Sequence, residues 1–120
     1  MKRRDLIAEL DRETRRLVFE REMGRCFVCG AQGHDPAHLF SRRNLATRWD
    51  RHEKGNVHVL CRTCHDLDHG GLLSPSYQEV FVSRFGEDVL MELASRAASV
   101  ARWLDGELLL MLHDMRCERV

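Results

Sequence analysis

The sequence lacks an excess of charge of either sign, because 19 lysine and arginine residues balance 19 aspartate and glutamate residues. A chain without net charge is not expected to bind nucleic acid indiscriminately through long-range attraction. The sequence also lacks any apolar run approaching the roughly 20 residues that span a bilayer. Its first residues lead into further charged residues and not into the apolar core of a signal peptide. We therefore expect a cytoplasmic protein with no membrane partner.

The sequence has only two prolines and shows no repeat, low-complexity tract or flexible linker. Its 120 residues, 43% of them apolar, suffice for one compact domain with appended elements. Apolar residues recur near the helical period over residues 2–22 and predict an amphipathic N-terminal helix that ends at Gly24. We divide the chain into this N-terminal helix (1–23), a segment rich in cysteine and histidine (24–71), and a C-terminal helical extension (72–120).

The C-terminal extension carries two helical patterns. Ser74 and Pro75 suit the N-cap and the first position of a helix over about 75–85, and Gly86 suits its end. Apolar residues then recur at intervals of three or four, in one helix or in two separated at Gly106. These residues are Val89, Leu93, Ala97, Val100, Leu104, Leu108, Met111 and Met115. We expect this stripe to pack against the N-terminal helix, and a dimer interface is the alternative.

Four of the five cysteines form two Cys-x-x-Cys pairs, separated by 31 residues. A turn of this kind can direct two thiolates at one ion, and two such turns complete a tetrahedral shell that suits zinc. A redox-active pair is the alternative, but the sequence shows no thioredoxin-like pattern. We predict one structural zinc ion bound by Cys26, Cys29, Cys61 and Cys64. Cys117 is expected to be a small apolar residue on the last helix.

Histidine and asparagine residues lie within and directly after this cysteine framework. His38 falls in a stretch (37–40) that is typical of a strand, and Asn56 directly precedes a second one (57–60). His65 follows the last cysteine of the framework, in a short helix that Gly70 and Gly71 end. The order of these three residues within four zinc-spaced cysteines is more specific than any one of them alone.

Residues 24–71 resemble the His-Asn-His (HNH) family of nucleases. Many members carry a stretch like Asn-Val-His-Val-Leu-Cys-Arg-Thr-Cys-His at 56–65, and residues 35–42 resemble the first histidine motif of bacterial and phage members. The resemblance implies an α+β, treble-clef-like fold, in which a β-hairpin and a helix surround a catalytic metal (ββα-metal) and a four-cysteine zinc holds them together. It also implies a metal-dependent endonuclease that hydrolyses phosphodiester bonds in DNA, as a hydrolase of bacterial or phage DNA processing.

The resemblance implies a role for each residue of the triad. His38 would be the general base, because a neutral imidazole with an ordinary pKa near 6.5 can take a proton from water. His65 would bind the catalytic divalent ion, which could be Mg²⁺, Mn²⁺, Ni²⁺ or Zn²⁺ and would act as a Lewis acid. Asn56 would hold the histidine-bearing strand in place through its amide.

The sequence departs from the family pattern at Ala37, where many members have an acidic or histidine ligand. Asp35 lies two residues earlier and shares a strand face with that position, so it could replace the ligand or could instead cap a turn. His69 lies one helical turn after His65 and could complete the metal site or simply face solvent. The other histidines are expected at the surface (His34, His52, His113) or on a strand facing the substrate or solvent (His58).

The loop between the two strands, residues 41–55, is rich in arginine. Guanidinium groups bind phosphates through paired hydrogen bonds, so we expect Arg42, Arg43 and Arg48 to contact DNA. The alternative for the loop is a solvated polar connection. Trp49 is expected to pack as an apolar anchor rather than to stack on bases.

Two other functions are compatible with the sequence. The first is a non-catalytic zinc module that binds nucleic acid or protein, which the alanine at position 37 favours because a lost ligand could mean a lost activity. The second is assembly, in which the acidic C-terminal helices form a homodimer or dock on a phage or bacterial DNA-processing partner. The second role could coexist with cleavage.

Overall fold

The computed structural model describes residues 1–119 and shows a mixed fold of helices around one small sheet. Helix α1 spans Arg3–Arg21, and strands β1 (Asp35–His38) and β2 (Val57–Leu60) form an antiparallel hairpin. Four helices follow: α2 (Arg62–His69), α3 (Tyr77–Phe85), α4 (Glu87–Ala97) and α5 (Asp105–Cys117). The α+β class is confirmed, and a four-cysteine cluster lies where the hairpin meets α2. No described helix combines the length and the apolar character needed to cross a membrane.

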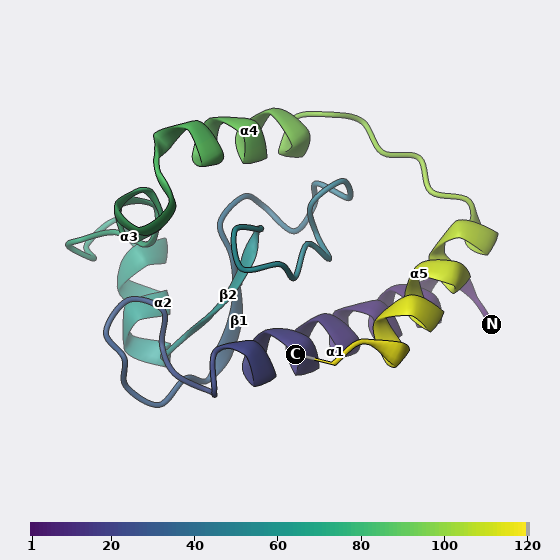
Figure 1. Ribbon diagram of the computed structural model, residues 1–120, viewed down its shortest axis with the longest axis horizontal. Helices are drawn as coiled ribbons and strands as arrows, with labels where there is room; N and C mark the ends of the chain where they lie inside the picture. Colours follow the sequence, from purple (N-terminus) through teal and green to yellow (C-terminus); the bar gives the residue numbers. More distant parts are fainter. Residues whose placement is uncertain (120) are drawn as a thin grey trace.

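Helix α1 is the expected N-terminal helix, and it packs on two partners. Leu6, Leu10 and Leu17 are buried with residues of α5 and with Trp49. Val18, on the same helix, packs against Val57 and Val59 of the hairpin. Figure 1 shows α5 lying alongside α1 while the hairpin rises from the middle of the molecule. Helix α1 therefore joins the C-terminal helix to the hairpin.

The hairpin has two faces, and each face is covered by different helices. Directly opposed residues of an antiparallel pair point to the same face. His38 pairs with Val57, and that face meets α1. Ala37 pairs with His58, and that face belongs to the cluster that includes the zinc-spaced cysteines and helices α3 and α4. All four residues of β2 are buried for this reason.

Helix α3 begins two residues later than the sequence predicts. Its N-cap is Ser76 and not Ser74, because the Ser76 hydroxyl accepts a hydrogen bond from the Glu79 backbone N–H at 3.1 Å. The Tyr77 backbone N–H also donates to the Asp68 carboxylate at 2.9 Å, which ties the start of α3 to α2. The predicted end at Gly86 is confirmed.

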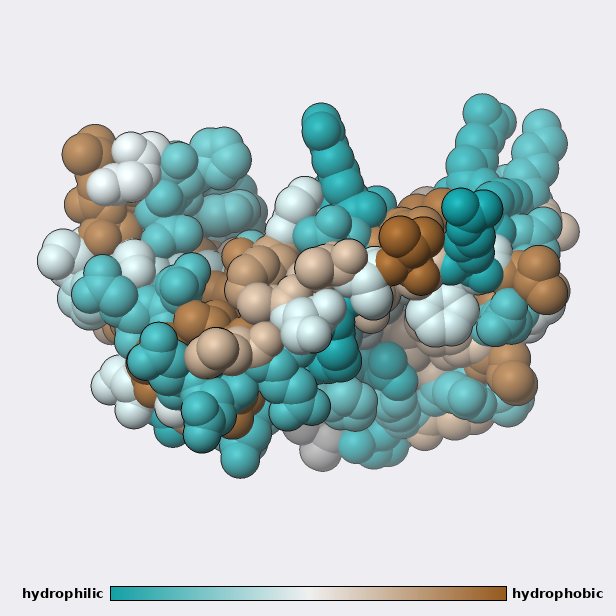
Figure 2. Space-filling model, turned by 90° about the horizontal axis from the view of Figure 1, so that it is seen from above, coloured by the Kyte–Doolittle hydropathy of each residue, from teal (hydrophilic) through white to brown (hydrophobic). Residues whose placement is uncertain are grey.

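The C-terminal apolar stripe forms two helices with different partners. Its later part, on α5, packs on α1 as expected, whereas its earlier part, on α4, packs on α3 and the cysteine cluster. The break falls at residues 98–104 and not at Gly106, which lies in the first turn of α5. Val100 and Leu104 were expected in the packed stripe but lie in this connection and are exposed. Figure 2 shows exposed apolar residues in separate patches among hydrophilic side chains.

Candidate functional site

The four predicted zinc ligands are gathered into one cluster. Their Sγ atoms all lie within 4.8 Å of one another, and those of Cys29 and Cys61 are 3.7 Å apart. Gly30 follows the first pair with φ 76°, a left-handed conformation that tightens the turn. Burial would raise the pKa of Cys26, but hydrogen bonds from backbone N–H groups outweigh it and lower that pKa to about 7. Four convergent thiols with N–H groups directed at the sulfur atoms fit a structural metal ion such as zinc.

Asn56 is fully buried and fastens the loop after β1. Its side-chain oxygen accepts from the Phe40 backbone N–H at 2.7 Å, and its amide donates to the Phe40 carbonyl at 3.0 Å. The same amide donates to the Thr47 carbonyl at 3.2 Å. The expected holding role of Asn56 therefore has a structural basis, since these bonds fix both the residues that follow His38 and the middle of the loop.

His38 is held in one tautomer by the same loop. Its Nε2 atom lies 2.9 Å from the Arg48 carbonyl oxygen, which can only accept, so Nε2 carries the proton and Nδ1 keeps a free lone pair. Burial lowers the pKa of His38, and the charge of Arg42 adds to this, against the hydrogen bond to Arg48. His38 is therefore neutral at pH 7 and has a basic nitrogen available.

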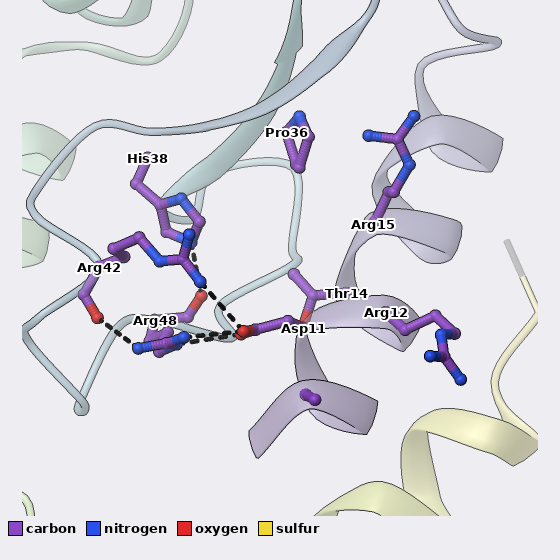
Figure 3. Close-up of a pocket in the computed structure, with 9 residues that line it drawn as sticks. Asp11, Arg12, Thr14, Arg15, Pro36, His38, Arg42 and Arg48 are labelled. Carbon is purple, nitrogen blue, oxygen red and sulfur yellow. Dashed lines mark hydrogen bonds and ion pairs between the residues drawn. The ribbon is translucent and has the colours of Figure 1, made fainter. Parts of the chain in front are cut away.

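A pocket of about 330 Å³ lies between His38 and α1 (Figure 3). Arg42 and Arg48 approach it from the loop, while Arg12 and Arg15 extend from α1. Its remaining lining residues are Ala8, Asp11, Thr14 and Pro36. The pocket therefore combines one imidazole base with four guanidinium groups and one carboxylate. Arg12 and Arg48 pair closely with Glu9 and Asp11, so Arg15 and Arg42 are the arginines better placed to meet an anionic group such as a phosphate.

The three arginines predicted to contact DNA have different surroundings. Arg48 is largely buried and binds both carboxylate oxygens of Asp11, at 3.0 and 2.7 Å, so most of its hydrogen-bonding capacity is used within the protein. Arg42 is more exposed and makes one bond to Asp11, at 3.1 Å. Arg43 is exposed and pairs with no acidic group in residues 1–119. Trp49 is buried against α1 and α5, which confirms its expected role as an anchor.

His65 lies away from His38. Its Nδ1 atom is 3.1 Å from the Asp35 carboxylate, whose other oxygen lies 3.3 Å from Arg62. Burial would raise the pKa of Asp35, but hydrogen bonds from His65 and Arg62 outweigh it and lower that pKa. Asp35 and His38 are three positions apart on β1, about 10 Å along the strand, and so point to opposite faces.

The structure brings together two of the three residues that were expected to bind the catalytic metal ion. Asp35 and His65 could offer two ligands, but His69 is exposed. Within the described chain, the four cysteines form the only cluster of three or more metal-binding side chains. No third metal-binding side chain joins Asp35 and His65 within residues 1–119, and His38, the expected base, is not one of these ligands, so we derive no chemical step from a second metal ion.

The structure corrects the interpretation of His58 as facing either the substrate or solvent. It is fully buried, and its Nε2 donates to the Glu53 carbonyl at 2.8 Å. Its Nδ1 accepts from the Tyr77 hydroxyl at 2.6 Å, and that hydroxyl also lies 3.2 Å from the Ala37 carbonyl. Burial lowers the pKa of His58 to about 3. Ala37 is itself 1% exposed, so this position faces the core and not an open cleft.

The contribution of α1 to the pocket was not predicted. Ala8, Asp11, Arg12 and Arg15 occupy positions i, i+3, i+4 and i+7 and so share one face of that helix, a stripe that is charged at three of the four positions. The stripe is visible in the sequence, but a charged stripe on an amphipathic helix usually faces solvent. The packing of Val18 on the hairpin and the hydrogen bonds of Asp11 to the loop turn this stripe toward His38.

Comparison with protein-family models, with curated proteins and with solved structures finds no match to this chain.

Proposed function

We propose that the protein is an endonuclease of the HNH type that hydrolyses phosphodiester bonds in DNA, with His38 as the general base and zinc as a structural ion. The observation that carries this proposal is the hydrogen bond from His38 Nε2 to the Arg48 carbonyl. This hydrogen bond fixes the imidazole ring and leaves Nδ1 free to accept a proton. The imidazole lies beside a pocket that four arginines line. Proton transfer to a positioned base of this kind contributes about 10²- to 10⁴-fold to the reaction rate.

In the proposed reaction, Nδ1 of His38 takes a proton from a water molecule as the water oxygen attacks the phosphorus atom. The P–O bond to the leaving oxygen breaks, the leaving oxygen takes up a proton from solvent water, and His38 later returns its proton to solvent. Negative charge grows on the phosphate oxygens during this step, and guanidinium groups stabilise such charge. Arg42 is the first candidate for this contact, because it is exposed and makes a single bond to Asp11.

Zinc has a structural role in the proposal. Each of the four cysteines uses its thiol at the cluster, so a tetrahedral shell would be closed and would leave no position for a substrate. The bound ion would fix the hairpin on α2 and so maintain the surroundings of His38.

A non-catalytic zinc module is the second candidate function, and one observation favours it. Ala37 offers no ligand beside Asp35 and His65, and no third metal-binding side chain joins that pair within residues 1–119. A protein of this kind would bind nucleic acid or another protein through its arginines without cutting. Assembly through the C-terminal helices could accompany either function.

A substrate panel tests the proposal. Purified protein is incubated with supercoiled, linear, single-stranded and branched DNA, and with RNA, in the presence of Mg²⁺, Mn²⁺, Ni²⁺ or EDTA, while binding is measured by fluorescence anisotropy. The proposal predicts cleavage of at least one DNA substrate. Binding without cleavage on every substrate would support the second candidate, and cleavage of RNA alone would overturn the choice of DNA.

A further inference from the structure

The Asp11 carboxylate on α1 accepts hydrogen bonds from three residues of the loop between the strands. Arg48 donates through Nε at 3.0 Å and through a terminal nitrogen at 2.7 Å, one bond to each oxygen. The Trp49 indole N–H donates at 2.9 Å, and Arg42 donates at 3.1 Å. One side chain of α1 therefore organises three side chains that lie 31 to 38 residues further along the chain.

Arg48 is the residue that connects Asp11 to His38. Arg48 is held by Asp11 through its side chain, and its backbone carbonyl accepts the Nε2 hydrogen bond of His38. Asn56 holds the preceding residue, Thr47, by its carbonyl. The backbone that orients the imidazole is thus fixed from two sides, by Asn56 from the hairpin and by Asp11 from α1.

The contact between Asp11 and Arg48 differs from an ordinary surface ion pair. It is bidentate, and the side chains are only 29% and 16% exposed, so solvent screens it less than an exposed pair. Arg42, by contrast, is 59% exposed and makes one bond. Arg48 is therefore suited to a fixed position in the protein, whereas Arg42 can leave Asp11 for a phosphate.

We propose that Asp11 is a positioning residue for His38, acting through Arg48, and that α1 is part of the functional site and not only a support for α5. This inference rests on the proposed role of His38 as the base. Asp11 touches neither substrate nor reacting atoms in this scheme. It fixes the carbonyl that selects the imidazole tautomer.

The first test reads the hydrogen bond directly and needs no activity. A ring N–H held against a carbonyl exchanges slowly with water, so His38 Nε2–H gives a one-bond ¹H–¹⁵N signal, which is assigned by its absence in His38→Ala. The signal is expected in the wild type and in Glu20→Gln, a control that removes the exposed carboxylate partner of Arg16 on the same helix. It is expected to disappear in Asp11→Asn, whose amide cannot accept both guanidinium hydrogen bonds. A retained signal in folded Asp11→Asn would overturn the proposal.

A second variant covers the case in which Asp11→Asn does not fold. Arg48→Lys keeps the positive charge and the backbone carbonyl, but one ammonium group cannot match the two carboxylate oxygens. The same loss of the His38 signal is expected, and its retention in the folded variant would contradict the proposal.

Kinetics provide the second test. For the nuclease, Asp11→Asn is expected to lower kcat about tenfold to a hundredfold with KM within about twofold, as for a displaced catalytic group. If the wild type shows no cleavage, the proposed function fails while the NMR result still decides the role of Asp11. A kcat equal to that of Glu20→Gln would reduce Asp11 to a stabilising residue and overturn the inference.

Discussion

The Nε2 atom of His38 and the carbonyl oxygen of Arg48 are 2.9 Å apart, and this bond joins the end of β1 to the middle of the loop that follows it. Because the carbonyl can only accept, the bond selects which nitrogen of the imidazole stays basic. The position of the loop backbone therefore determines that Nδ1 of His38, and not Nε2, is the nitrogen that can accept a proton.

Asn56→Ala is expected to destabilise the protein by about 2–4 kcal/mol, because it leaves the Phe40 N–H and the Phe40 and Thr47 carbonyls without their partner. Urea denaturation measures the effect. Asn44→Ala is the control, since Asn44 lies in the same loop and its side chain makes no hydrogen bond within residues 1–119. Equal denaturation midpoints for the two variants would contradict the role assigned to Asn56.

Cys64→Ser is expected to abolish binding of one zinc ion per chain and to unfold the hairpin region, since metal affinity of a four-thiolate site is also folding free energy. Zinc analysis and thermal unfolding monitor the two effects. Cys117→Ser is the matched control, because Cys117 ends α5 and lies outside the cluster. A wild-type protein without bound metal, or one whose stability is unaffected by chelators, would refute the structural role of zinc.

His58 gives the protein a predictable loss of stability in acid. Its pKa in the folded state is about 3, below the ordinary 6.5, so between these values the unfolded chain binds a proton that the folded protein does not. The free energy of unfolding therefore falls as the pH falls, by about 1.4 kcal/mol per pH unit from this residue. His38 contributes in the same direction, because its pKa is also lowered.

Denaturation curves between pH 4.5 and 6.5 test this origin. His58→Asn is expected to be less stable than the wild type and to show a slope smaller by about 1.4 kcal/mol per pH unit. His52→Asn, a change at an exposed histidine, is expected to keep the full slope. Parallel slopes for His58→Asn and the wild type would assign the acid sensitivity to other groups.

His65→Ala is expected to retain one zinc ion per chain and to lose about 1 kcal/mol of stability or less, since its pair with Asp35 is partly exposed. Isothermal titration with Mn²⁺ and Zn²⁺ measures the number of sites. A second ion bound by the wild type and lost in His65→Ala would show that a catalytic metal centre forms at this position after all.

The cysteine cluster could be predicted because each Cys-x-x-Cys pair has the short spacing of a metal-binding turn, whereas the role of Asn56 was expected only from the family resemblance and its hydrogen bonds are compatible with it. The contact of Asp11 with Arg48 could not be predicted, because they lie 37 positions apart in the sequence and a charged residue on a helix has many alternative partners. The burial of His58 also escaped prediction. Alternation along β2 gives no sign that α3 and α4 cover the second face of the hairpin.

Errors at the C-terminal helices have a similar origin. Both Ser74 and Ser76 suit an N-cap, and the choice depends on Glu79 and on the contact of the Tyr77 N–H with Asp68. Apolar residues continue to recur at intervals of three or four through residues 98–104, although no helix forms there. A periodic pattern predicts a helix face but does not say which partner buries it.

Plasmid cleavage by the wild type, His38→Ala and His34→Ala, with zinc content and folding verified for each, tests the central claim most directly. We predict cleavage by the wild type and by His34→Ala, which changes an exposed histidine outside the pocket, and a loss of about 10²-fold or more in His38→Ala. Equal cleavage by His38→Ala and the wild type, or no cleavage by the wild type with any divalent ion, would contradict this claim.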